Sequence, residues 1–216
     1  MSIKIYKFNL DAFFASKFFS PIRSNEDIYI LLMNTIDFIT IYKSLGIKSD
    51  ESKIGEITVV VDKMSRIFYH SSMKHFSVAC PFFIQEDDSS GGISFHSKGA
   101  GEVNTWITSI TRRILSGKMH AYNCVGSFAD KVLDQDIYAE NVWSLLSELF
   151  TFESGYLRYD IDPEPSRCCP VNHPLHHIDL FFSNKATFKI GIERELTSDN
   201  FIDMLNNNTA VKYIKG

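Results

Sequence analysis

The sequence predicts an α+β fold, in which an N-terminal helical part packs on a small antiparallel C-terminal sheet. Before residue 150, apolar residues recur mainly at the spacing of one helix face. After Phe150, they alternate with polar residues, as in a strand that has one buried face. We therefore expect a mainly helical part at residues 1–150 and an antiparallel sheet with a closing helix at residues 151–216, together forming one compact domain.

The first helix is expected to begin at Ser24 or Asn25, since either side chain can cap a helix. Apolar residues follow at helical spacing until Gly46, which is placed to end the helix. Residues 57–70 admit a helix or a strand. The length of this segment favours a helix, whereas its β-branched run ITVVV also suits a buried strand.

Two further helices are expected before the sheet. At residues 103–114 the apolar side chains share one helical face, and Gly117 follows the last turn. At residues 141–150 the leucines are spaced to face a core. Before the first of these two helices, an apolar run at residues 76–84 is followed by EDDSSGG, which is typical of a polar turn or loop.

The C-terminal segment predicts three strands and a last helix. The apolar members of the first strand share one face and the polar members share the other: Leu157, Tyr159 and Ile161 against Tyr156, Arg158, Asp160 and Asp162. A second strand is expected at about 176–182 and a third at 187–192, joined as a hairpin by a turn at 183–185. Thr197 or Ser198 caps the helix, and the tail VKYIK is expected as an edge strand or without order.

Charged side chains gather on one face of this predicted sheet. On the second strand, Ile178 and Leu180 indicate the core side, so His177 and Asp179 should project to the opposite surface. If the three strands are neighbours, five polar side chains converge there: Arg158, Asp160, His177, Asp179 and Lys189. This alternation predicts one polar surface patch.

Such a patch suits phosphodiester cleavage without a metal or other cofactor. His177 titrates near neutrality and is our candidate acid or base. Arg158 and Lys189 are candidates to stabilise charge on a phosphate oxygen, and Asp160 to orient the imidazole. RNA is the favoured substrate, because its 2′-hydroxyl is an internal nucleophile. Further candidates are His173 and His176 for catalysis, and Tyr156 and Asp179 for substrate binding.

Other interpretations of the same residues stay open. Five of them carry atoms that suit a divalent ion: Asp160, Asp162, His173, His177 and Asp179. The segment HPLHH lacks the glutamate of the helical zinc-protease motif, and Pro174 argues against a helix there. A polar strand face is also the ordinary solvent side of an antiparallel sheet.

The composition limits the function classes. The chain has 216 residues, 44% of them apolar, so it can bury a core without disulfide staples. Its net charge of -4 argues against non-specific electrostatic binding of nucleic acid by the whole protein, though not against a local basic site. The four cysteines form no CxxC pair, which disfavours a structural zinc and favours reduced thiols in a cytoplasmic protein. No segment has the apolar length of a membrane span, so no membrane partner is expected.

The C-terminal quarter resembles the TumE-type toxins, which are small bacterial proteins of toxin–antitoxin modules thought to act on RNA. The resemblance runs from Tyr156 to Leu205 and consists of an R-Y-D-x-D strand, an H-P-x-x-H segment and an apolar closing helix. The matching residues are Arg158, Tyr159, Asp160, Asp162, His173, Pro174, His176, His177, Phe201 and Leu205. The chain departs from those toxins by the insertion PEPSRCCPVN and by its long N-terminal part.

The residues and the resemblance together leave two functions open. The first is a toxin-like or phage-defence endoribonuclease, or another phosphodiesterase, that uses the polar patch on the C-terminal sheet. The alternative is a non-catalytic partner, an accessory subunit of a bacterial defence or toxin–antitoxin operon that binds a cognate protein through aromatic residues. The resemblance implies RNA or a cognate antitoxin as the partner.

Overall fold

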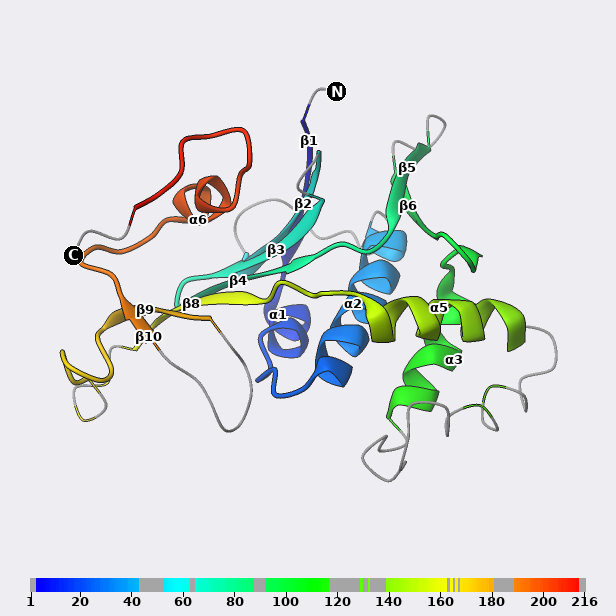
Figure 1. Cartoon of the computed structure of the whole chain (residues 1–216), viewed down its shortest axis with the longest axis horizontal. Coiled ribbons are helices and arrows are strands. Elements are labelled where there is room, and N and C mark those ends of the chain that lie inside the picture. Colours follow the sequence, from blue (N-terminus) through cyan, green and yellow to red (C-terminus); the bar gives the residue numbers. More distant parts are fainter. Residues whose placement is uncertain are drawn as a thin grey trace. The chain divides into compact units, whose positions relative to one another are not determined.

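The computed structural model describes residues 3–42, 53–62, 65–87, 92–116, 129, 132, 139–162, 164, 166, 168–180 and 189–213. The chain divides into two compact units (Figure 1). The first contains Met1–Ser24, Ile47–Cys80 and Ser154–Gly216, and the second contains Asn25–Gly46 and Pro81–Glu153. The chain therefore leaves the first unit twice and returns to it for its C-terminal segment.

The first unit is built on a seven-stranded antiparallel sheet. Its strands, in spatial order, are β1 (Lys4–Leu10), β2 (Gly55–Val61), β3 (Arg66–Ser71), β4 (Lys74–Ala79), β8 (Leu157–Ile161), β9 (His176–Asp179) and β10 (Lys189–Gly191). Neighbours from β1 to β4 follow one another in sequence, and β8 then pairs with β4 after the excursion through the second unit. The C-terminal strands thus extend a sheet that the N-terminal strands begin.

The predicted fold class was wrong in its N-terminal half. That half is not mainly helical, because it supplies β1 to β4 of the large sheet and a second, three-stranded sheet; the fold is a mixed α+β arrangement. For the described residues between 57 and 70, the strand alternative was correct and the favoured helix was wrong, since this segment contributes to β2 and β3. The physical reason is burial on both faces: Ile57 and Phe68 are 0% exposed, as are Val59 and Tyr69. A strand covered on both sides loses the polar–apolar alternation that identifies strands.

Within the described residues, the second unit contains three helices with complete bounds and the smaller sheet. The helices are α2 (Asn25–Ile41), α3 (Thr105–Leu115) and α5 (Ala139–Thr151), and the sheet is β5 (Phe83–Asp87), β6 (Gly92–Ser97) and β7 (Gly101–Glu102). All three helices were predicted. The N-cap of α3 is Asn104, whose side chain accepts hydrogen bonds from the backbone N–H groups of Trp106 and Ile107. Among the described helices, none has the length and apolarity needed to cross a bilayer.

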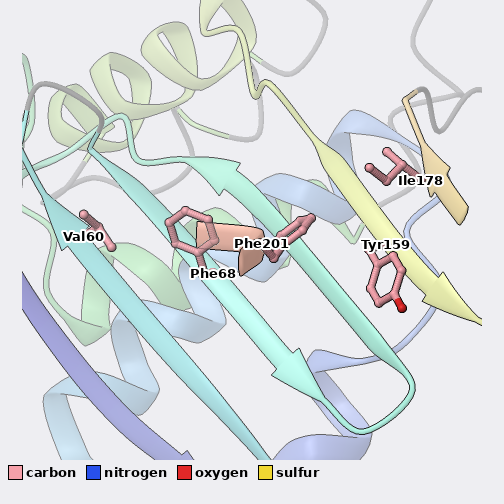
Figure 2. Packing of buried hydrophobic residues seen from close by; sticks show 5 residues of the cluster. All are labelled: Val60, Phe68, Tyr159, Ile178 and Phe201. Carbon is pink, nitrogen blue, oxygen red and sulfur yellow. The ribbon is translucent and has the colours of Figure 1, made fainter. Parts of the chain in front are cut away.

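Two short helices cover opposite faces of the large sheet, α1 (Ala12–Phe18) and α6 (Ser198–Met204). Adjacent residues of β3 show this: Phe68 packs against Phe201 of α6, whereas Tyr69 packs against Phe18 of α1. Figure 2 shows Phe201 beside Phe68, in a core cluster that also contains Val60, Tyr159 and Ile178. The face that lacks α6 is the one that carries the predicted polar patch.

The C-terminal elements agree with the sequence prediction. The strands β8, β9 and β10 are antiparallel neighbours, and α6 begins after Thr197, whose side chain accepts from the backbone N–H of Asn200. The predicted turn at 183–185 lies outside the described residues. Residues 211–213 of the tail form no strand.

Candidate functional site

The register of the last three strands brings the predicted charges together. Arg158 lies opposite Asp179, and Asp179 lies opposite Lys189, so the three form one row across the sheet. In the next row, Asp160 lies opposite His177. Because alternate residues of a strand point to the same side, both rows project from the α1 face. The structure therefore brings all five residues of the predicted patch into one cluster.

Asp179 lies at the centre of this cluster. Its side chain is 3% exposed, and it accepts hydrogen bonds from the Lys189 ammonium, at 2.9 Å, and from the Arg158 guanidinium. Arg158 also places its Nε 2.7 Å from Oδ2 of Asp160. Burial by itself raises the pKa of Asp179, but the Lys189 hydrogen bond and the Arg158 charge outweigh burial and hold this pKa below its usual range. Asp179 is therefore an ionised carboxylate between two cations.

His177 is held as a neutral imidazole. Its Nδ1 lies 2.8 Å from the carbonyl oxygen of Pro174, which only accepts, so the Nδ1 proton donates to it. Its Nε2 lies 2.8 Å from Nζ of Lys189 and accepts from that ammonium. Burial, and then the Lys189 charge, lower the pKa of His177. These contacts define one tautomer and occupy both ring nitrogens.

The surface exposure predicted for His177 and Asp179 was wrong, because their side chains are 1% and 3% exposed. At this burial, Asp179 holds the neighbouring cations and is not accessible to a substrate, contrary to the substrate-binding role expected from the sequence. The loop before β9 explains the difference. Gly191 of β10 lies opposite His177, and a Cβ on Gly191 would come within 3.1 Å of Pro174. The loop therefore folds over the strand end, where Pro174 contacts one ring nitrogen, and the Lys189 ammonium contacts the other. The neighbouring Arg158, Asp160 and Lys189 side chains remain 21–23% exposed.

His173 adds a second imidazole at the edge of the cluster. Its ring centre lies 4.7 Å from that of His177, and its Nδ1 lies 3.8 Å from Oδ2 of Asp162. A tight turn positions this residue, because its backbone exchanges both hydrogen bonds with Cys169. Its side chain is 28% exposed. His173 is thus the imidazole of the cluster that solvent reaches.

Two other predicted site residues do not share this accessible cluster. His176 points to the α6 face, where its Nδ1 lies 2.8 Å from the Tyr159 hydroxyl. Tyr156 is on the cluster's face beside Arg158, but it is 6% exposed and packs against Phe76. Burial raises the pKa of Tyr156 to about 12. Because Tyr156 is buried and interacts with Arg158, its role is to support the guanidinium and not to bind a substrate.

The sequence analysis missed Lys74. This residue of β4 lies opposite Asp160 in the register, so it adds a further cation to the row that contains His177. Burial, and then the charge of Arg158, lower the pKa of Lys74. The residue was missed because β4 was not recognised as a neighbour of β8; the alternation in KHFSVA was the available signal.

The cluster also has the spacing of a metal site. Within the described residues, donor atoms of Asp160, His177 and Asp179 lie within 4.8 Å of one another. The Lys189 ammonium, however, contacts both His177 Nε2 and Asp179 Oδ1. The ammonium therefore supplies the positive charge that a metal ion would bring to these two ligands.

No family model, curated protein or solved structure matches the chain. The resemblance to TumE-type toxins accordingly stays a prediction, and the functional argument depends on the geometry of the cluster.

Proposed function

We propose that the protein cleaves phosphodiester bonds in RNA at the cluster on the α1 face. One observation carries this proposal: His177 connects partly exposed cations on one side to a partly exposed imidazole–carboxylate pair on the other. Arg158 and Lys189 supply the cations, and His173 with Asp162 supplies the pair. Anion-binding groups beside an acid or base are what cleavage of a phosphodiester requires.

His173 is the proposed base, because it is accessible while His177 is covered. It accepts the proton of a ribose 2′-hydroxyl, and Asp162 stabilises the imidazolium that forms. The 2′-oxygen then bonds to the adjacent phosphorus as the bond to the 5′-oxygen breaks. The departing 5′-oxygen takes a proton from water, and the hydroxide that forms takes the proton from the His173 imidazolium, which returns His173 to its neutral form. The products are a 2′,3′-cyclic phosphate end and a 5′-hydroxyl end.

The cations bind the phosphate in this proposal. Arg158 offers a planar pair of N–H donors, and Lys189 offers a charged point donor. Both are preorganised: the buried Asp179 carboxylate accepts hydrogen bonds from both of these partly exposed cations, and neutral His177 accepts from Lys189. Preorganised donors stabilise the charge that builds on the phosphate oxygens without reorganising at the moment of reaction.

The test is cleavage of a labelled single-stranded RNA by purified protein in EDTA. We expect cyclic-phosphate products from the wild type and a rate about 10²- to 10⁴-fold lower for His173→Ala. Arg158→Gln should also lose activity, whereas His96→Ala, in the three-stranded sheet, is the control and should keep it. Intact RNA with wild type, or equal rates for wild type and His173→Ala, would refute the proposal. The same variants should differ in toxicity when expressed.

A metal-dependent phosphoesterase is the second candidate, favoured by the spacing of Asp160, His177 and Asp179. For this function, the Lys189 ammonium has to leave its place between His177 and Asp179. Lys189→Met should then raise the affinity for Mn²⁺, and protein purified without chelator should carry a stoichiometric metal in elemental analysis. Metal-free protein that cleaves RNA in EDTA excludes this candidate.

A non-catalytic partner module is the third candidate, favoured by exposed aromatic side chains of the second unit. Phe83 and Trp106 are each 67% exposed, and Trp143 is 42% exposed. Aromatic residues of this kind anchor protein interfaces. Co-purification of a stoichiometric protein that Trp106→Ala releases, without nuclease activity in any metal, would favour this function over the first two.

A further inference from the structure

The opposite face of the large sheet bounds a cavity of ≈ 990 Å³. Apolar side chains of β8, β9 and β10, including Leu157, Ile178 and Ile190, form its floor. Met204 and Leu205 of the α6 end and the tail from Asn206 to Tyr213 line its other sides. The volume lies in the range of sites that enclose small organic ligands, which are mostly apolar with a few placed polar groups.

Four charged side chains line this cavity, and Arg66 is the partly buried one, whereas Glu193, Arg194 and Lys212 are exposed. Arg66 projects from β3 and lines the cavity. Its Nε donates to the hydroxyl oxygen of Ser77 at 2.7 Å, and its Nη2 donates to the carbonyl oxygen of Gly155 at 2.5 Å. These neutral acceptors hold the guanidinium in place and leave further N–H donors.

The charge of Arg66 has no counterion among the described residues. No described carboxylate forms an ion pair with it. Lys212, another cavity-lining cation, is by contrast paired with Asp203 at 2.5 Å. Burial without a compensating charge lowers the pKa of Arg66 to about 10. A partly buried guanidinium without a carboxylate is costly, and an anionic ligand would relieve that cost.

The approach to Arg66 is also shaped by the backbone. Gly155 has φ +51°, a conformation that favours glycine, and a Cβ at this position would come within 3.0 Å of Arg66 Nη1. The absence of a Cβ therefore lets the backbone at Gly155 lie close enough to the guanidinium to accept its hydrogen bond. At the outer side of the cavity, Val211 and Tyr213 are 74% and 84% exposed, so apolar surface of the tail faces solvent.

We infer that this cavity binds an amphipathic organic anion, whose carboxylate or phosphate head pairs with Arg66 and whose apolar body lies against Leu157, Ile178 and Ile190. The site is on the other face of the sheet from the proposed nuclease cluster. Its occupancy is therefore separate from RNA cleavage, and either proposal can fail without the other.

Titration calorimetry with C12 probes, below their critical micelle concentrations, tests this inference. Dodecanoate and dodecyl phosphate present the two anionic heads; dodecanol and dodecyltrimethylammonium carry the same apolar body without an anion. Wild-type protein should bind at least one anion and bind the ammonium probe more weakly. Arg66→Gln should weaken anion binding about 10- to 100-fold, as expected for loss of charged hydrogen bonds, and should leave dodecanol binding unchanged.

Two further variants keep the test decisive. Arg66→Lys retains a cation and should bind anions better than Arg66→Gln, even if the glutamine variant folds poorly by circular dichroism. Arg113→Gln, an exposed arginine of α3 outside the cavity, is the matched control and should bind as wild type does. The inference is overturned if wild type binds neither anion, if the ammonium probe binds equally well, or if the Arg66 variants bind anions as tightly as wild type.

Discussion

Replacement of Asp179 by asparagine tests the electrostatic description of the cluster. The substitution keeps the shape of the side chain but removes the charge that Arg158 and Lys189 share. Removing one partner of a buried ion pair typically costs 3–5 kcal/mol, because the remaining charge is left uncompensated. Asp160, 2.7 Å from Arg158, partly offsets that loss. We therefore expect the free energy of unfolding to fall by about 3 kcal/mol.

Asp160→Asn is the matched control. Asp160 contacts the same arginine, but its side chain is 23% exposed against 3% for Asp179, so solvent screens its charge. A loss of about 0.5–1 kcal/mol is expected. Urea denaturation at pH 7, followed by far-ultraviolet circular dichroism, measures both variants with the slope m as a check on the unfolded state. A loss below about 1 kcal/mol for Asp179→Asn, or equal losses for the two variants, would contradict the reasoning.

Two further predictions concern the α6 face. Burial lowers the pKa of His70 to about 3, and neither of its ring nitrogens has a hydrogen-bond partner among the described residues. Because only the unfolded chain takes up this proton as the pH falls below about 6.5, stability should decrease by about 2 kcal/mol from pH 7 to pH 5. In His70→Phe, the urea midpoint should depend less on pH than it does in wild type. Parallel curves of midpoint against pH for the variant and wild type would contradict this expectation. Phe201→Ala should lower the free energy of unfolding by about 3–5 kcal/mol, because this ring is 0% exposed and packs on Phe68. The control Phe13→Ala removes a ring that is 59% exposed and should change stability by less than about 0.5 kcal/mol. Equal urea midpoints for the two variants would exclude the packing role of Phe201.

The C-terminal strands were predictable because each has one apolar face. In β8, Tyr159 faces the core and Arg158 faces away from it. The alternation of apolar and polar residue types along the sequence shows this difference directly. The same alternation in β9 predicted that His177 and Asp179 share a side. The central strands β2 and β3 were not predictable in this way. Both faces of these strands are covered, as Phe68 and Tyr69 illustrate. Their sequences therefore do not alternate between apolar and polar residues.

The sequence by itself determined which side chains share a face of the C-terminal sheet, because the pleat of a strand is a local property of the backbone. Only the tertiary structure decided how deeply each of them lies and what it contacts. The fold of the loop at Pro174 over Gly191 covers His177, and the neighbouring strand places the Lys189 ammonium on its ring nitrogen. The tertiary structure also pairs β4 with β8, which adds Lys74 to the cluster. Burial and pKa depend on groups that are distant in sequence, and the folded chain alone brings those groups together.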